Sequence, residues 1–294
     1  MKPVSEKPEL SVQTLAIRGV GLIGGSIAKA ARKARIVQEI IGIGRDEARL
    51  QKAVEHQIID RFETDSKLAA SQADLIVVCT PVDCIAQDII QLHSGLRPEA
   101  LITDAGSVKE QIVREVAEKL GAGHRYLGSH PLAGSEKTGF EHAEADLFQN
   151  AVVVLTPEEQ SSKNDLKFLE TFWKSLGGKI TIMSPAEHDR ALAATSHLPH
   201  LIAAALASSV PEDQLPLAAT GFGDTTRIAS GDPHLWTSIF CQNSNGTLAA
   251  AKEFQQQLNA LLDAVEAKDT DKINTLLKAA KTRRDLWQQD RNNP

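Results

Sequence analysis

The sequence predicts an α/β fold, in which a doubly wound and mostly parallel sheet is followed by an all-helical second domain. Short apolar runs typical of buried strands alternate with helical patterns in the first half of the chain. After about Met183 no convincing strand follows, and the remaining stretches are rich in Ala, Leu, Gln, Glu and Lys. We therefore expect a first domain over residues 1–184 and a second over residues 185–294.

The strand-like runs of the first domain are separated by segments long enough for helices or loops. They are residues 15–18, 40–43, 75–79, 100–103, 126–128, 151–155 and 179–182. A helical pattern over 108–120 begins after Ser107, a candidate N-cap, and ends at Gly121. Breaks around 211–216 and 221–233 divide the second domain into separate helices.

A glycine-rich turn joins the first strand-like run to the first helical pattern. Its sequence is Gly19-Val-Gly21-Leu22-Ile23-Gly24-Gly25-Ser26. Glycine permits a tight turn and a close approach of backbone amides to a pyrophosphate, and the N-terminus of the following helix favours negative charge. Because the motif follows a strand and opens a helix, it indicates a dinucleotide-binding domain of the Rossmann type.

The turn after the second strand bears on the choice of dinucleotide. An acid usually stands here to bind the adenine ribose, but this chain has Gly44 followed by Arg45. A small residue beside an arginine leaves space and positive charge for a ribose phosphate, which favours NADP over NAD. Two alternatives stay open: Arg45 is simply solvated, or Asp46 reaches the ribose.

The composition excludes several classes of protein. With 42% hydrophobic and 24% charged residues the chain is typical of globular proteins, and its formal net charge of −6 argues against nucleic acid as a partner. No apolar run reaches the roughly 18 residues that span a bilayer, and the first residues lack the apolar core of a signal peptide. We therefore expect a cytoplasmic protein without a membrane partner. Cys79, Cys84 and Cys241 have neither disulfide nor metal-site spacing, so we expect inert thiols.

A run of small and apolar residues extends almost without interruption over 191–210. A helix that is apolar on all sides has to be buried, so we expect it at a domain or subunit interface and predict a homodimer; the core of the second domain is the alternative. Polar residues interrupt this run, with Ser196 and His200 on one helix face and His197 on a neighbouring face. A lone buried histidine is usually structural, but two histidines flanking a proline in such a helix favour a functional site.

Three further polar clusters are candidate sites. His130 lies in the segment 128–139 directly after a strand, where ligands bind to doubly wound sheets, although an ordinary turn with a surface histidine is possible. Ser107 also follows a strand and could both cap a helix and bind a ligand. Arg227 stands among small and apolar residues and offers a fork for carboxylates, unless it pairs with Asp224.

Together these clusters resemble the prephenate and arogenate dehydrogenase family of tyrosine biosynthesis, from about Leu15 to Trp287. The motifs that carry the resemblance are GxGLIGGS, TDxGSVK, HPxAGSEKTG, SHLPH and TRIAxxDPxLW. The resemblance implies oxidative decarboxylation of a small cyclohexadienyl substrate. A hydride leaves the ring carbon that bears the hydroxyl, carbon dioxide departs, and the ring becomes aromatic. It implies no metal.

The resemblance also implies roles for individual residues. His130 is expected to bind the ring hydroxyl and help remove its proton, Ser107 to contact the same hydroxyl, and Arg227 to bind a substrate carboxylate. The other expected substrate contacts are His200, Ser196, His197, Ser135 and Glu136. The expected cofactor contacts are Gly19, Gly21, Leu22, Ile23, Gly24, Gly44, Arg45, Asp46, Thr80, Pro81 and Asp104.

Several alternatives stay open. Prephenate, which carries a keto group, is preferred over arogenate, which carries an ammonium group, and NADP is preferred over NAD. Another two-domain dehydrogenase, such as a hydroxyacid dehydrogenase or an imine reductase, is disfavoured in its lysine-dependent form because no lysine lies between Lys179 and Lys252. A non-catalytic nicotinamide sensor would not need His130, Ser107 and Arg227 together. Since no regulatory segment is recognised, we expect any feedback by tyrosine to act at the active site.

Overall fold

The computed structural model describes residues 10–134 and 137–292, with side chains as far as residue 289. The chain forms two compact units, Met1–Ser244 and Asn245–Pro294. The first unit contains both sheets and the helices up to α10, and it carries every candidate site residue that the structure describes.

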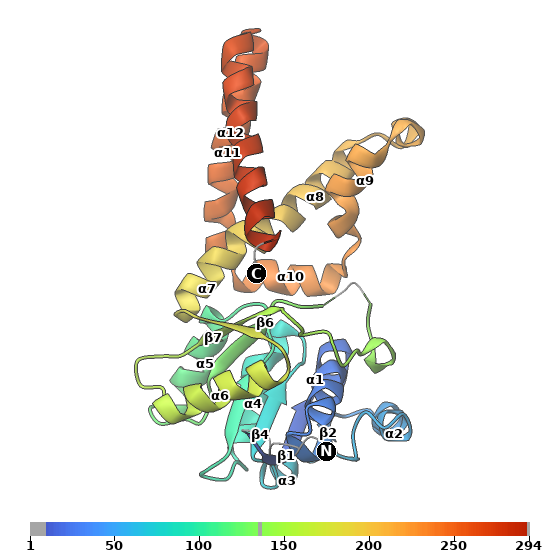
Figure 1. Ribbon diagram of the computed structural model, residues 1–294, viewed down its shortest axis with the longest axis vertical. Helices are drawn as coiled ribbons and strands as arrows, with labels where there is room; N and C mark the ends of the chain where they lie inside the picture. The colour runs from blue at the N-terminus through green and yellow to red at the C-terminus, as the bar shows by residue number, and fades with distance from the viewer. Residues whose placement is uncertain (1–9, 135–136, 293–294) are drawn as a thin grey trace, which may run out of the picture. The chain divides into compact units, whose positions relative to one another are not determined.

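A five-stranded parallel sheet forms the centre of the first unit (Figure 1). Its strand order is β3-β2-β1-β4-β5, so the order reverses at β1 and opens a crevice at the carboxyl ends of β1 and β4. The strands are β1 (Val12–Arg18), β2 (Val37–Ile43), β3 (Arg61–Glu63), β4 (Leu75–Val78) and β5 (Leu101–Asp104). Arg18 pairs in register with Ile43 on one side and Val78 on the other, so these three strands end at the same level.

Helices cover both faces of this sheet and create two apolar cores. Alternate residues of β1 enter different cores, with Leu15 and Ile17 in one and Ala16 in the other, as the two-residue period of a strand requires. The helices are α1 (Leu22–Lys33), α2 (Glu47–Glu55), α3 (Ser66–Ala70), α4 (Val82–His93) and α5 (Glu110–Leu120). The predicted doubly wound architecture is therefore confirmed.

A second sheet of three strands differs in detail from the expectation. It contains β6 (Gly128–Pro131), β7 (Val152–Thr156) and β8 (Lys179–Ile182), with the short helix η1 (Phe140–His142) and α6 (Lys163–Ser175) between them. Strand β6 runs antiparallel to β7, whereas β7 and β8 are parallel. A bridge between Ile102 and Tyr126 connects this region to β5. The sheet therefore places the start of β6 close to the end of β5.

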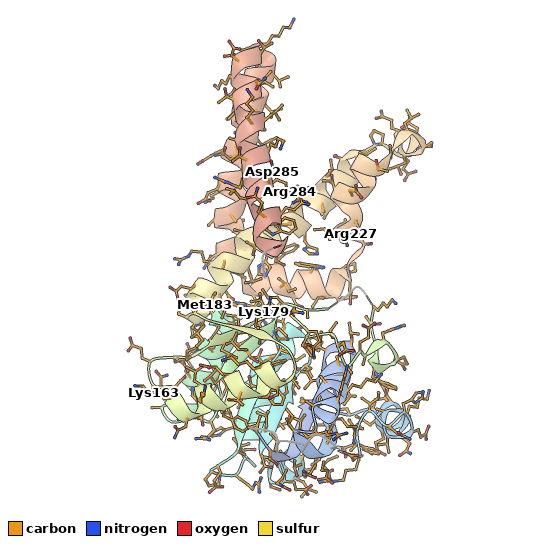
Figure 2. The ribbon with its side chains drawn as sticks, in the orientation of Figure 1. Lys163, Lys179, Met183, Arg227, Arg284 and Asp285 are labelled. Carbon is orange, nitrogen blue, oxygen red and sulfur yellow. The ribbon has the colours of Figure 1, made fainter. Side chains whose placement is uncertain are left out.

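The chain passes from β8 to a continuous helical segment at Met183 (Figure 2). This segment comprises α7 (Pro185–Leu192), a π-helical turn η2 (Ala193–His197) and α8 (Leu198–Ser209). After this segment ends at Ser209, separate short helices follow: η3 (Glu212–Leu217), α9 (Thr220–Thr226), η4 (Arg227–Ser230) and α10 (Pro233–Gln242). A capping box between Ser184 and Glu187 fixes the start of α7.

The helix over Pro185–Ser209 corrects the expectation that no apolar stretch is long enough to span a bilayer. By length and mean hydropathy (1.2) alone it could cross a membrane, a test that core helices of globular proteins also pass. In this structure its His188 and Asp189 contact residues of the first domain. The helix thus supplies polar groups to the interior of the first unit.

The second unit consists of two helices, α11 (Ser244–Glu266) and α12 (Thr270–Asn292). Residues 185–292, all of which are described, contain helices and turns but no strand, as predicted. Several large apolar side chains on these two helices are exposed, among them Leu248, Leu262 and Leu277.

Candidate active site

A cavity of about 950 Å³ lies at the carboxyl ends of β1, β2 and β4. Seven of the residues expected to contact a dinucleotide line it: Gly19, Gly21, Gly44, Arg45, Asp46, Thr80 and Pro81. Leu22, Ile23 and Gly24 form the first turn of the adjoining helix α1. The crevice at the switch point of the sheet and the expected cofactor residues therefore coincide in space.

The glycine turn has the geometry that a diphosphate group needs. Gly19 has a φ angle of +93°, which side-chain-bearing residues rarely adopt. A Cβ atom at Gly24 would lie 2.4 Å from the backbone oxygen of Gly19, so only glycine lets α1 approach the turn this closely. A Cβ at Gly21 would meet no atom within 4 Å, which leaves open space in front of its backbone. These residues fit the phosphates of a dinucleotide above the N-terminus of α1.

The turn after β2 contains Arg45 and Asp46, and Arg49 follows in the first turn of α2. Asp46 is the N-cap of α2, and its Oδ1 accepts the backbone N–H of Arg49 at 3.0 Å. Arg49, which the sequence analysis did not single out, lines the cavity together with Arg45. The cap therefore engages one carboxylate oxygen of Asp46 in the helix, while two exposed guanidinium groups border the cavity.

Asp104 occupies the interior instead of the cavity wall. Its side chain is fully buried, and Oδ1 accepts hydrogen bonds from the hydroxyl of Tyr126 (3.0 Å) and the backbone N–H of Ser129 (3.2 Å). Oδ2 accepts from the backbone N–H of Gly106 (2.8 Å) and from Nζ of Lys109. This setting differs from the expected contact with the cofactor, because all four donors come from the protein itself. Asp104 instead ties the end of β5 to β6 and to the loop before α5.

Lys109 is the fully buried partner of Asp104 and a residue that sequence reasoning assigned no role. Its Nζ also donates to the backbone oxygen of Ser129 at 3.0 Å. Burial lowers the pKa of Lys109, while the neighbouring Asp104 carboxylate acts in the opposite direction. Since Ser129 immediately precedes His130, the buried pair fixes the backbone from which the histidine side chain projects.

His130 begins a chain of hydrogen bonds that crosses from β6 to α7. Its Nδ1 lies 2.8 Å from Nε2 of His188, whose Nδ1 lies 2.7 Å from Oδ1 of Asp189. A carboxylate only accepts, so His188 donates from Nδ1 and, when neutral, accepts at Nε2 from the Nδ1–H of His130. The remaining ring nitrogen of His130, Nε2, then carries a lone pair. The arrangement thus makes His130 a proton acceptor.

The electrostatic surroundings keep His130 neutral. Burial lowers its pKa well below the usual value of 6.5, and the nearby His188, Lys109 and His197 lower the pKa further. Burial also lowers the pKa of His188, although the hydrogen bond to Asp189 opposes this effect. At neutral pH both imidazoles are therefore in their basic form.

Asp189 joins the helical segment to the nucleotide-binding part of the unit. Its carboxylate accepts the backbone N–H groups of Lys109 (2.8 Å) and Glu110 (3.0 Å), which are the first amides of α5. Its backbone oxygen accepts from the side-chain amide of Asn243 at 2.7 Å. A side chain of α7 therefore provides the cap of α5 and at the same time orients His188.

Ser107 does not cap that helix. The expectation was a helix beginning at residue 108, but α5 begins at Glu110 with Lys109 at the N-cap and no capping side chain of its own. The physical reason is that Asp189 already satisfies the first amides from outside the helix. Ser107 is half-buried in the loop between β5 and α5, the same loop that carries Lys109.

The histidines of the long helix lie against α10. His197 is almost fully buried, and its Nδ1 accepts from the amide of Asn243 at 3.2 Å, so that its Nε2 carries the proton. The π-helical turn departs from the regular helix that was assumed when Ser196 and His200 were placed on one face. His200 donates from Nδ1 to the backbone oxygen of Ser196 at 3.0 Å, and its ring stacks on Trp236 with centroids 3.4 Å apart.

Arg227 begins η4, between α9 and α10 (Figure 2). It is exposed, and its positive charge contributes to lowering the pKa of His200, after burial as the larger cause. Ser135 and Glu136, expected substrate contacts, lie outside the described residues.

Comparison with known proteins identifies the family. The nucleotide-binding domain of prephenate dehydrogenase matches residues 27–182, and the dimerization domain of prephenate dehydrogenase matches residues 184–279. This chain belongs to the prephenate dehydrogenase family. The resemblance inferred from the motifs is therefore confirmed, and the chain is an oxidoreductase with a nicotinamide cofactor. A different two-domain dehydrogenase and a non-catalytic sensor are set aside.

Individual members of the prephenate dehydrogenase family are similar over most of the chain. The prephenate dehydrogenase of Bacillus subtilis is 34% identical over 92% of this chain and 75% of its own length. The cyclohexadienyl dehydrogenase of Zymomonas mobilis is 32% identical over 87% of this chain and 90% of its own length. A crystal structure of Aquifex aeolicus prephenate dehydrogenase with hydroxyphenyl propionate and NAD+ has a TM-score of 0.88 at 34% identity. It covers 94% of this chain and 98% of that one.

The family matches and the compact units divide the chain at different places. The two matches meet between residues 182 and 184, whereas the compact units meet between 244 and 245. The expected domain boundary at 184/185 stays a prediction. Residues 185–244 pack with the nucleotide-binding part because Asp189 accepts the amides of Lys109 and Glu110, and the side-chain amide of Gln242 donates to the backbone oxygen of Val82 at 3.2 Å.

Proposed function

We propose that this chain converts prephenate to 4-hydroxyphenylpyruvate and carbon dioxide while it reduces NADP. The observation that carries the proposal is the hydrogen-bonded chain His130–His188–Asp189 in the same unit as the dinucleotide crevice. A base that is held neutral and presents a free lone pair suits the removal of a proton from the substrate hydroxyl. A relative that is 34% identical over 92% of this chain carries the name prephenate dehydrogenase.

Each residue has a definable task in this reaction. A nicotinamide cofactor bound in the crevice would supply the hydride acceptor. His130 accepts the hydroxyl proton at Nε2 as the ring carbon takes on carbonyl character, and His188 stabilises the imidazolium that forms, because Asp189 compensates the added charge. Arg227 binds a carboxylate of the doubly anionic substrate, which is otherwise repelled by a protein of net charge −6.

The proposal is tested by initial rates of reduced nicotinamide formation with saturating prephenate, measured in parallel with NADP and NAD. We expect turnover that depends on prephenate. No turnover with either cofactor, in protein that still binds reduced nicotinamide, would contradict the proposed substrate.

Arogenate is the second candidate, and one observation favours it. Because His200 donates from Nδ1 to Ser196, its neutral Nε2 is an acceptor, which suits an ammonium group better than a keto group. His197, in contrast, has a proton on Nε2 and offers a donor. A crystal structure of Synechocystis arogenate dehydrogenase has a TM-score of 0.82 to this chain at 33% identity, and covers 94% of this chain and 100% of that one. The ratio of kcat/KM for the two substrates decides between them.

The preference for NADP depends on the turn after β2. Gly44 leaves space there, Asp46 is engaged as a helix cap, and Arg45 and Arg49 border the cavity. Guanidinium groups bind phosphate strongly, and the ribose of NADP carries one where NAD has a hydroxyl. The positive charge of both arginines supports NADP as the better ligand.

Replacing both arginines is expected to reverse this preference. In the variant R45A/R49A the KM for NADP should rise by about tenfold or more, while the KM for NAD changes little, because only NADP loses a phosphate contact. Steady-state kinetics with each cofactor measure the effect. K52A, which removes an exposed positive charge from the same helix outside the cavity, is the control. Equal changes in the KM for both cofactors would show that the arginines do not bind the ribose phosphate.

We also propose a homodimer formed through the helical domain, in the cytoplasm. Residues 184–279 match a dimerization domain, and leucines such as Leu217 and Leu262 are exposed in the single chain. Sedimentation equilibrium at micromolar protein is expected to give twice the mass of the chain. A monomer over the whole range of concentrations would contradict this proposal.

A further inference from the structure

A buried ion pair lies on the wall of the dinucleotide cavity. Arg18, the last residue of β1, donates from Nε and Nη2 to Oδ1 of Asp88 at 3.0 and 2.8 Å. The two side chains are only 11% and 8% exposed, and both residues line the cavity. Arg18 immediately precedes Gly19, so the pair is anchored directly beside the phosphate-binding turn.

The ion pair extends to the opposite side of the crevice. The hydroxyl of Thr80 donates to Oδ2 of Asp88 at 2.7 Å, so both oxygens of the carboxylate are engaged. Thr80 lies in the turn between β4 and α4, and it lines the same cavity. The three side chains therefore connect the two turns between which a dinucleotide binds, one after β1 and one after β4.

Stability alone does not account for such a pair. A buried ion pair contributes little to folding compared with apolar side chains of similar volume, because both charges lose their hydration. Here the charges border a cavity that receives an anionic diphosphate. Asp88 alone would repel that ligand. Arg18 compensates its charge, and the two hydrogen bonds from the guanidinium to Oδ1 fix the position of the carboxylate. Asp88 in turn restricts the rotamer of Thr80.

We propose that Arg18 and Asp88 are positioning residues for the nicotinamide dinucleotide. They hold the turn at Thr80 in place opposite the glycine turn, so that the crevice is formed before the cofactor arrives. Preformed geometry improves affinity because the ligand does not have to order the turn itself. The inference depends on the cofactor crevice and not on the identity of the substrate.

The test is the dissociation constant of NADPH and of NADH, measured by nicotinamide fluorescence without substrate. R18M is expected to weaken binding of both by about tenfold or more, since it leaves Asp88 uncompensated and Thr80 misplaced. D88N should also weaken binding, because an amide has one acceptor oxygen where the carboxylate has two. T80V, which removes the hydroxyl, should also weaken binding, whereas T80S keeps the hydroxyl and should bind both cofactors as tightly as the unmodified protein.

A matched control tests whether loss of an ion pair away from the cavity also weakens cofactor binding. Arg97 pairs with Asp74 between the start of β4 and the loop after α4, outside the residues that line the cavity. R97M is therefore expected to leave both dissociation constants unchanged. The double variant R18M/T80V should bind no more weakly than R18M, because the two side chains act through one chain of contacts.

Two outcomes would overturn the proposal. Affinities of R18M and D88N within twofold of the unmodified protein would show that the pair has no part in cofactor binding. Weaker binding in R18M together with tighter binding in D88N would show that Arg18 attracts the cofactor directly as a cation and does not act through Asp88 and Thr80. Because cofactor binding is measured alone, a failure of the prephenate assay would leave this test unaffected.

Discussion

Replacing His130 by asparagine is expected to lower kcat for prephenate by about 10²–10⁴-fold, the range that a general base contributes. The amide of asparagine keeps a polar group near His188 but cannot accept a proton at neutral pH. The KM for NADP should change little, because His130 is not among the residues that line the dinucleotide cavity. Steady-state kinetics of H130N together with NADPH binding separate the two effects. A kcat within tenfold of the unmodified protein would show that another group removes the proton.

Replacing Asp189 by alanine is expected to affect both stability and catalysis. The substitution leaves three donors without their acceptor: the backbone N–H groups of Lys109 and Glu110 and the Nδ1–H of His188. Asp189 is only 3% exposed, so water does not replace the lost carboxylate. We expect a loss of about 2–4 kcal/mol in the free energy of unfolding. The kcat should fall as well, because His188 is then free to adopt the tautomer that no longer accepts from His130.

Two comparisons make the effect of D189A specific. D146A removes the carboxylate of the exposed pair with Lys33 and should change the free energy of unfolding by less than about 0.5 kcal/mol. D189N keeps one acceptor oxygen, so it should recover part of the stability but not the kcat, because the compensating charge is lost. Denaturant unfolding and kinetics are measured on all three variants. An unchanged denaturation midpoint in D189A would contradict the role of Asp189 as the cap of α5.

Local patterns accounted for much of the first sheet. The glycine turn, the apolar runs of β1, β2 and β4, and the helical character beyond Met183 depend on neighbouring residues and were therefore visible in the sequence. Strand β3 was not predicted, because Arg61–Glu63 has no apolar pattern and becomes a strand through backbone pairing with β2. The antiparallel pairing of β6 with β7 likewise depends on contacts that no single segment reveals.

The candidate site was predictable only in part for the same reason. His130 could be placed from its position after a strand-like run, which is a local property. Its partner His188 lies 58 residues further along the chain, so the hydrogen bond between them exists only in the folded protein. Asp104 shows how a local pattern can mislead. An acid at a strand end is typical of a ligand contact, but Asp104 is buried in an ion pair with Lys109, five residues later.

The central claim is that a neutral His130 accepts the proton. The most direct test is the pH dependence of kcat/KM for prephenate. The pKa of His130 is lowered well below 6.5, and burial lowers the pKa of His197 to about 4, so protonation of these groups begins only in acid. The rate should therefore be constant around neutral pH and fall as the pH decreases, with a midpoint below 6.5, and H130N should lose this limb. A rate that declines as the pH rises from 6 to 8 would require an imidazolium form and would contradict the account.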